Sequence, residues 1–245
     1  MRALAKNFER IAAAASDQQI WVPFKPYKLF TRYGICAPWH LSPRMIPTPD
    51  VTTLHAPITR DVQSNIEKAR WDSFLGHAKP ITLAKNSVHR LELQAESHVT
   101  AFLNLEYKKG AGSRIQVTYA EAYRDADTRK KGDRTKREGC VLTGPQDHFE
   151  ISHKVDQDVT CRWEPLWWRA FRFLVVDIHV GDTPLSLVGL SMEQTNYPAP
   201  TLAQWEVGQA SEMRRSDKIL AVSLRTLRNC LFDGFADCPF YEQLQ

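Results

Sequence analysis

The sequence predicts a mainly β protein, in which an antiparallel β-sandwich over residues 71–198 is followed by a single amphipathic helix. Three observations predict this. Apolar and polar residues alternate in several runs after Ile81, turn-forming residues separate these runs, and the period changes to that of a helix after Tyr197. Alternation puts one face of a strand in a core and the other in water, whereas spacings of three and four gather apolar side chains on one helix face.

Apolar residues at every second position predict strands at 91–95, 99–105 and 115–119, with Phe102 as the one break in the alternation. Gly110-Ala-Gly112 is a turn signal between the last two of these runs. Two further apolar runs, from 168 to 178 and from 185 to 192, complete a set of strands whose spacing is typical of a β-sandwich.

The run 115–119 gives the sharpest expectation about strand orientation. Val117 and Tyr119 occupy the apolar positions of the alternation, and Gln116 and Thr118 occupy the polar ones. We therefore expect Val117 and Tyr119 to point into the core, and Gln116 and Thr118 to point outward.

Residues 1–70 form a proline-rich N-terminal segment, which is either a linker or the tail of an incomplete domain. Its high proline content predicts short extended pieces, because proline disrupts long helices and central strands. No secretory signal is visible at the N-terminus, so a cytoplasmic or unknown location is expected. The prolines concerned are Pro23, Pro26, Pro38, Pro43, Pro47, Pro49 and Pro57.

After 198 the sequence predicts one amphipathic helix, from about Asp217 to Phe232, with Ser216 as its N-cap and Asp233-Gly234 as its end. Its apolar stripe has no expected partner in the rest of this sequence. The stripe consists of Leu220, Leu224, Leu227 and Leu231, at spacings of four, three and four.

Composition excludes several classes of protein. The chain has 245 residues, of which 43% are hydrophobic, and it contains seven tryptophans, so it is not a disordered chain. No apolar run approaches the roughly 20 residues of a membrane helix, and no membrane partner is expected. The formal net charge is +4, and the segment 124–138 supplies +3 of it with seven basic and four acidic residues. A mixed-sign run without aromatic residues is typical of an exposed loop, so no nucleic-acid partner is expected.

The cysteines are five in number and irregularly spaced, which is not typical of a disulfide framework or of a zinc site. Free thiols are expected. His148 and His153 with Cys161 come nearest to a metal set, but nothing in the sequence puts them on one face, and no glycine-rich phosphate loop is present. We expect neither a metal nor a cofactor.

The strongest candidates for chemistry are two carboxylates that follow the helix, Asp237 and Glu242. They flank Cys238-Pro239 and the aromatic pair Phe240-Tyr241, a setting that suits a pocket in which one carboxyl keeps its proton. The spacing alone favours a structural interpretation, in which Asp237 caps a turn and Glu242 lies on an exposed face.

The C-terminal sequence resembles the start of the helical catalytic domain of α-L-rhamnosidases, which are six-hairpin glycosidases. The resemblance rests on two stretches, Ser223-Leu-Arg-Thr-Leu-Arg-Asn-Cys230 and Asp237-Cys-Pro-Phe-Tyr-Glu242-Gln-Leu-Gln. The signature of that family is an Asp-Cys-Pro triplet with an essential carboxylate five residues after the aspartate, the position of Glu242. Residues 115–122 and 163–173 are similar to the β-sandwich that precedes this domain, so that the resemblance covers about 81–245.

This resemblance implies inverting hydrolysis of a terminal α-L-rhamnoside. Glu242 would be the general acid that protonates the leaving oxygen, and Asp237 would bind sugar hydroxyls. The second carboxylate that activates water in an inverting enzyme is contributed in the family from further along the helical domain. The family signature continues beyond Glu242 with a Gly-Asp pair that this sequence lacks, since it stops at Gln245.

The resemblance also implies that residues 199–245 are the truncated start of an (α/α)6 barrel. Twelve helices of about 11–12 residues need roughly 130 residues, whereas only 45 follow Pro200. We expect the front part of a glycosidase, inactive by itself, with a rhamnoside as its partner and an oligomeric state that the sequence leaves open. Two alternatives remain open, a non-catalytic carbohydrate-binding or structural β-sandwich and a six-hairpin glycosidase with another sugar specificity.

Overall fold

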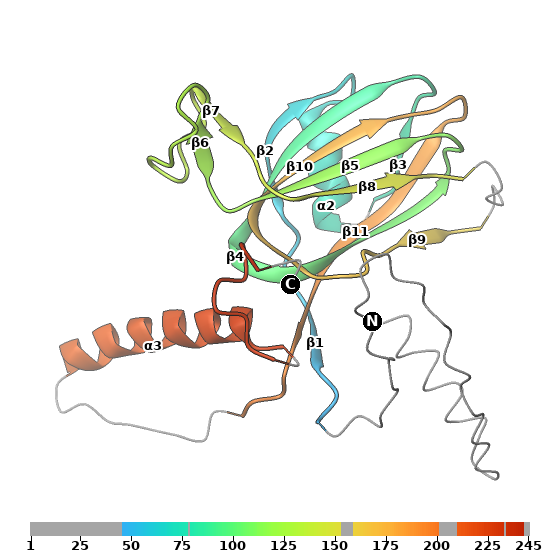
Figure 1. The fold of residues 1–245 in the computed structure, drawn as a ribbon. Helices are drawn as coiled ribbons and strands as arrows, with labels where there is room; N and C mark the ends of the chain where they lie inside the picture. The colour runs from blue at the N-terminus through green and yellow to red at the C-terminus, as the bar shows by residue number, and fades with distance from the viewer. Residues whose placement is uncertain (1–45, 78, 153–158, 201–209, 233, 243–245) are drawn as a thin grey trace, which may run out of the picture. The chain divides into compact units, whose positions relative to one another are not determined.

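A computed structural model describes residues 46–77, 79–152, 159–200, 210–232 and 234–242. The described part is mainly β (Figure 1). Residues from Thr48 onward form one compact unit. Its elements, in chain order, are β1 (Asp50–Thr53), β2 (Ile58–Gln63), α2 (Lys68–His77), β3 (Ile81–Leu83), β4 (Val88–Lys109), β5 (Arg114–Ala120), β6 (Tyr123–Asp125), β7 (Cys140–Leu142), β8 (Gln146–Glu150), β9 (Cys161–Trp163), β10 (Arg169–His179), β11 (Leu185–Asn196) and α3 (Ala210–Cys230).

The long strand β4 joins the two layers of an antiparallel sandwich. Its first half pairs with β2 and β10, and β10 continues the layer through β5 to β8. Its second half pairs with β9 and β11, and β11 continues the other layer to β1 and β3. The predicted runs 91–95 and 99–105 are therefore one strand that serves both layers, and the predicted antiparallel β-sandwich is confirmed.

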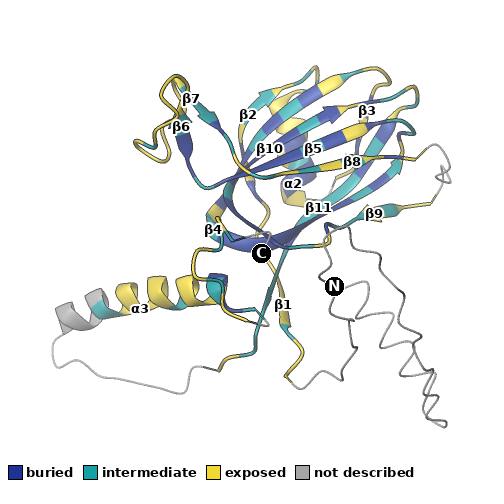
Figure 2. Cartoon of the chain, in the orientation of Figure 1, coloured by how far each residue is buried: buried dark blue, intermediate teal, exposed yellow. Residues whose placement is uncertain are grey.

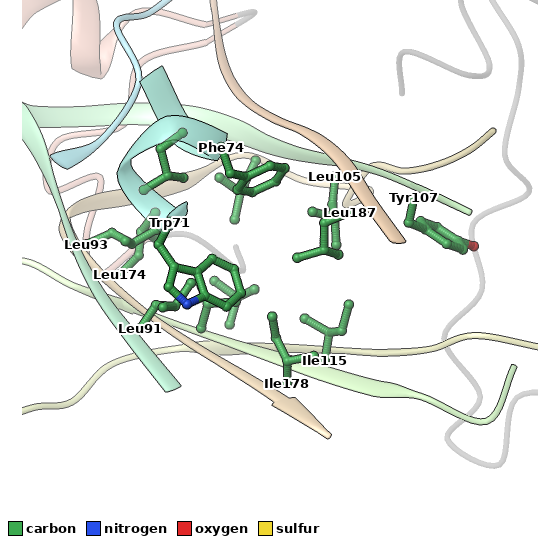
Figure 3. Packing of buried hydrophobic residues seen from close by; sticks show 14 of the residues in the cluster. Trp71, Phe74, Leu91, Leu93, Leu105, Tyr107, Ile115, Leu174, Ile178 and Leu187 are labelled. Atoms are coloured by element: carbon green, nitrogen blue, oxygen red, sulfur yellow. The ribbon is translucent and has the colours of Figure 1, made fainter. Parts of the chain in front are cut away.

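The main core lies between the two layers. Leu93 and Leu174 come from one layer and Leu103 and Leu187 from the other, and all four are at most 1% exposed. The helix α2 adds Trp71 to the same core, which Figure 3 shows beside Leu91 and Leu93. Close packing of this kind is what the alternating sequence requires, since each strand must bury one face.

The orientation expected for β5 is confirmed. Val117 and Tyr119 are buried in the main core, and Gln116 is half exposed on the opposite face. Thr118 also faces away from that core, but it is covered there and is only 5% exposed. The side-chain amide of Gln146 donates a hydrogen bond to the Thr118 hydroxyl at 3.1 Å, and thus helps to cover it.

The turn predicted at Gly110-Ala-Gly112 connects β4 to β5. Both glycines have positive φ, 78° and 75°, a region that costs little only without a side chain. A Cβ atom on Gly110 would also lie 2.5 Å from Leu185 Cδ1, so this tight turn requires glycine.

The short extended pieces expected for 1–70 are present in its described C-terminal part, but they are strands of the sandwich and not of a linker. The strand β1 pairs with β11 and the strand β2 pairs with β4, so the sandwich begins about twenty residues before the expected boundary at 71. Pro49 and Pro57 directly precede β1 and β2, positions where a missing N–H interrupts no ladder. The other prolines of the segment, except Pro47, lie outside the described residues.

The β6–β7 hairpin lies over the outer face of the β5 and β10 layer. Tyr123 and Leu142 from the hairpin pack there against Phe173 and Val175. The charged segment 124–138 forms the tip of this hairpin and is mostly exposed, as expected (Figure 2). Arg137 pairs with both Asp61 and Glu92, so the charged segment is attached to the sheet.

The C-terminal helix begins earlier than the sequence predicts. It spans Ala210–Cys230, which places the expected N-cap Ser216 inside the helix. Several described apolar residues on α3 are exposed, and Figure 2 shows most of the helix in the exposed colour. They are Ile219, Leu220, Val222 and Leu227.

Four of the five cysteines lie in the described part of the chain. Cys140, Cys161, Cys230 and Cys238 are free thiols, as expected, whereas Cys36 lies outside the described part. No helix in that part is long and apolar enough to cross a membrane.

Candidate functional site

The buried side chain of Asn229 helps to fix the end of α3 to the sandwich, together with Asn196 of β11, whose amide donates to the Leu231 carbonyl at 3.2 Å. Asn229 accepts hydrogen bonds at Oδ1 from the Thr100 backbone N–H at 3.2 Å and from Gln194 Nε2 at 3.0 Å. Its Nδ2 donates to the His98 carbonyl at 2.9 Å. Asn229 is only 6% exposed. Its amide both donates and accepts, so it can pair with two backbone groups of β4 that have no partner in the sheet.

An aromatic stack holds the residues that follow the helix. Phe232 lies parallel to Trp168, with ring centroids 4.2 Å apart and an interplanar angle of 8°. Phe102 packs into the same cluster, as does Phe240 from the C-terminal segment. Phe102 interrupts the alternation in β4 because its face of the strand is covered by the C-terminal segment and not by water.

The candidate carboxylates lie in the turns that follow this stack. The backbone N–H groups of Tyr241 and Glu242 both donate to the Cys238 carbonyl, at 2.8 and 3.0 Å. Asp237 is exposed and Glu242 is half exposed. The Glu242 carboxylate makes no hydrogen bond or ion pair to a described residue, which leaves it free to contact a ligand.

The two carboxylates share a neighbourhood with two thiols. Burial and the charges of Asp237 and Glu242 raise the pKa of the Cys230 thiol. The same carboxylates, Asp237 foremost, raise the pKa of the Cys238 thiol. The structure thus brings Asp237 and Glu242 to one place, and both thiols beside them are held in the protonated, unreactive form.

Tyr241 connects the C-terminal segment to the charged hairpin. Its hydroxyl accepts a hydrogen bond from Lys131 Nζ at 2.8 Å and lies 3.4 Å from Glu121 Oε1. Lys131 also pairs with Glu121. The hydrogen bond from the Lys131 ammonium lowers the pKa of the Tyr241 phenol. Part of the charged segment therefore positions the residue next to Glu242.

A largely buried ion pair joins Arg169 at the start of β10 to Asp147 on β8. The Arg169 guanidinium donates to both carboxylate oxygens of Asp147, with Nε to Oδ2 at 3.2 Å, and its carbon lies 5.8 Å from the centre of the Tyr119 ring. Burial lowers the pKa of Arg169, but its hydrogen bonds to Asp147 and the charge of Asp147 together raise it above its usual value. Gly144 lies against the Tyr119 carbonyl, where any Cβ atom would clash.

A basic cluster lies beside the anchored end of α3. Burial, followed by the charges of Arg134, Arg172 and Arg225, lowers the pKa of His98 to about 4. These arginines come from the charged hairpin, from β10 and from α3. His98 therefore lies where the charged hairpin and α3 approach the sandwich strand β10.

Two of the tryptophans pack against other aromatic side chains. Trp168 is buried against Phe232, and Trp163 stacks on Phe149 with centroids 5.5 Å apart. Among the described residues, no group of three or more histidines, cysteines and carboxylates is arranged to hold a metal ion, and His153 lies outside that part of the chain.

Sequence reasoning singled out Asp237 and Glu242 as candidates, but not the residues that hold their segment against the sandwich. Asn229, Lys131 and the Asp147–Arg169 pair act through partners between 22 and 131 positions away in the sequence. The only signal for any of them was the break of alternation at Phe102, which marks the covered face of β4.

Comparison with known proteins agrees with this fold. No family model matches the chain, and no curated protein matches it. A rhamnosidase from Klebsiella oxytoca with rhamnose bound is similar in structure, with a TM-score of 0.50 and 14% identity over 80% of this chain and 38% of that one. A GH78-family rhamnosidase of Bacillus sp. GL1 has a TM-score of 0.45 and 19% identity over 67% of this chain.

The chain spans 38% of the Klebsiella oxytoca chain and 16% of the Bacillus chain. A chitosan-binding module from Paenibacillus sp. IK-5 is a more distant match, with a TM-score of 0.30 and 11% identity. At these identities the similarity is one of fold, and the resemblance to rhamnosidases in the sequence is supported at that level.

Proposed function

We propose that this chain is the front part of an inverting glycoside hydrolase that releases terminal α-L-rhamnose from rhamnosides. The observation that carries the proposal is the segment from Asp237 to Glu242, which follows α3 and is held against the sandwich by Asn229 and the Phe232–Trp168 stack. The fold shared with the Klebsiella oxytoca rhamnosidase supports it.

In this proposal Glu242 donates a proton to the glycosidic oxygen as the bond to the sugar breaks. Asp237, which is exposed five residues earlier, accepts hydrogen bonds from sugar hydroxyls. Inversion requires a second carboxylate about 6.5–9.5 Å from the acid, with room for a water molecule between them. We assign that base to a helical domain that follows α3.

The sandwich has a positioning role in the proposed reaction. Tyr241 is fixed by Lys131 and Glu121 on one side of Glu242, and Phe240 packs into the aromatic cluster before it. These contacts restrict the backbone that carries the acid, and a positioned general acid typically contributes about 10²–10⁴-fold to the rate.

The 245-residue chain alone should be inactive. Glu242 is half exposed, and an acid in this role needs an enclosing wall that excludes water and keeps its proton in place at the working pH. The apolar residues exposed on α3 fit a helix that continues into a helical domain, which would supply that wall.

The test is hydrolysis of an aryl α-L-rhamnoside by the chain extended through a helical domain. Glu242→Gln should lower kcat by roughly 10²–10⁴-fold, and Asp237→Asn should raise KM as well as lower kcat. Glu96→Gln is the matched control, because Glu96 is an exposed carboxylate on β4, and it should leave both constants unchanged.

Two results would contradict the proposal. Robust turnover by the unextended chain would show that the missing base and wall are not needed. Near-normal kcat in the extended Glu242→Gln variant would remove Glu242 from the acid role.

A further inference from the structure

A polar groove of about 730 Å³ lies on the outer face of the layer formed by β8, β5, β10 and β4. Drug-sized and saccharide ligands occupy pockets of roughly 300–1,000 Å³, so the hollow is large enough for a ligand. The β6–β7 hairpin covers the neighbouring part of the same face, where Tyr123 packs on Phe173. One half of this face is therefore sealed by the hairpin and the other half is left open.

The register of the strands aligns the polar side chains of the groove in rows. Antiparallel pairing places four polar residues of the groove in one row that crosses four strands, a span of about 14 Å at the usual strand spacing. The row consists of His148, Gln116, Asp177 and Arg90. A parallel row beside it contains Glu150, Arg114 and His179.

Much of the hydrogen-bonding capacity of the groove is unused. Among the described residues, Gln116, His148 and His179 have no hydrogen-bond partner for their side chains, although all three are in or at the edge of the hollow. Arg90 donates to both oxygens of Asp177 through Nη1 alone, at 2.8 and 3.0 Å. Its other two guanidinium nitrogens make no hydrogen bond to a described residue.

The charges of the groove cancel. Arg90 is paired with Asp177, and Arg114 lies 3.9 Å from Glu150. Of the apolar lining residues, Ile115 and Val180 turn their side chains into the core, and Phe149 packs against it. The surface offers many donors and acceptors and little net charge, which does not suit an anion.

We propose that this groove binds a neutral oligosaccharide chain. Sugar hydroxyls both donate and accept hydrogen bonds, and they match a row in which an amide, an Arg–Asp pair and imidazoles alternate donors with acceptors. The length of the row suits several sugar units rather than one. No tryptophan or tyrosine side chain lines the hollow, so binding relies on hydrogen bonds and has a millimolar dissociation constant.

The groove is separate from the candidate site at the C-terminal segment. Glu121, which contacts Tyr241, lies five residues along the chain from Gln116, or about 16 Å along an extended strand. This inference shares with the proposed function only the chemical class of the ligand. It stands or falls independently of the role of Glu242.

The experiment is an NMR titration of the ¹⁵N-labelled 245-residue chain with a panel of oligosaccharides. The neutral probes are cellohexaose, xylohexaose, mannohexaose and a linear rhamnan oligosaccharide, and the charged comparison is an oligogalacturonate. At least one neutral probe should give saturable shifts that cluster on β5, β8 and β10. His148→Ala and Gln116→Ala should each raise its dissociation constant about threefold to tenfold, the effect of losing one hydrogen bond.

The matched control for His148→Ala is His77→Ala, because both histidines are exposed and His77 lies at the end of α2, away from the groove. This variant and Glu242→Gln should bind as the unmodified chain does. The inference is overturned if no neutral probe binds saturably, or if only the oligogalacturonate binds. Binding that is insensitive to His148 and Gln116 but weakened by Asp237→Asn would also overturn it, and would support the proposed function instead.

Discussion

Apolar residues are buried in the sandwich core, whereas several of them are exposed on α3. Leu83, Leu93 and Leu174 are completely buried between the two layers. On α3, Ile219 is 60% exposed and Val222 is 51% exposed. Because burial of apolar surface is the main stabilising contribution in a folded protein, the sandwich is stabilised by its own core, whereas α3 gains little from burial along most of its described length.

The two regions meet at a few specific contacts. Asn229 binds the backbone of β4, and Leu231 is 8% exposed next to it. The last turn of α3 is thus fixed by polar groups that recognise one place on the sandwich. The helix is therefore positioned by its C-terminal end. Contacts at that end, rather than apolar packing along the helix, connect it to the residues around Glu242.

The largest expected effect is in the core. Trp71 is fully buried and its indole lies edge-on to Phe74 and His89. Trp71→Ala should lower the free energy of unfolding by about 3–5 kcal/mol, which corresponds to roughly 6–20 °C in Tm for a domain of this size. Thermal unfolding followed by circular dichroism measures this, and a shift below about 2 °C would contradict the placement of α2 in the core.

The next effect concerns pH at the junction of the two regions. The pKa of His98 is about 4 in the folded chain, against 6.5 for an ordinary histidine, because of burial and three neighbouring arginines. The unfolded chain therefore binds more protons between these values, and stability is lost as the pH falls from about 6.5 to about 4. The loss due to His98 should reach up to about 3 kcal/mol.

Urea unfolding at pH 7 and at pH 5 tests this prediction. His98→Gln removes the titrating group, so its stability should fall less between the two pH values than that of the unmodified chain. An equal fall in both proteins would show that His98 is charged or solvated in the folded state.

A smaller effect is expected where α3 is anchored. Asn229→Ala removes the partners of the Thr100 N–H and of the His98 carbonyl. Leaving buried backbone groups unpaired should cost about 1–3 kcal/mol. The fluorescence of Trp168, which stacks on Phe232, should change with it, and an unaltered Tm together with an unaltered spectrum would contradict the anchoring role.

The smallest effect is expected on the exposed face of α3. Ile219→Ala removes an apolar side chain that is 60% exposed, and exposed substitutions usually change stability by less than about 0.5 kcal/mol. The Tm should therefore stay within about 2 °C of the parent value. A loss comparable to that of Trp71→Ala would show that this face is buried.

The alternating sequence could predict β4, β5, β10 and β11 because each buries one face in the main core. It could not predict that β1 and β2 belong to the sheet. A proline precedes each of these strands, and proline is tolerated just outside a strand. The sequence placed the start of α3 too late, because residues 210–216 are rich in helix formers but lack the apolar spacing on which the prediction relied.

The candidate site shows the same limit. Asp237 and Glu242 could be singled out because they lie close together in a recognisable order. The contacts of Tyr241 with Lys131 and Glu121 could not, since those partners are 110 and 120 residues away. Residues that support a site from a distant strand leave no local pattern, and only the fold brings them together.

Hydrogen exchange of the backbone amides, followed by mass spectrometry, tests most directly the claim that the sandwich is self-supporting and that α3 is held by its end. We expect slow exchange in β4 and β10, fast exchange in the middle of α3 around Ile219–Val222, and slower exchange at Asn229. Protection of 216–226 equal to that of β10 would contradict it, because the helix would then be stabilised as strongly as the core.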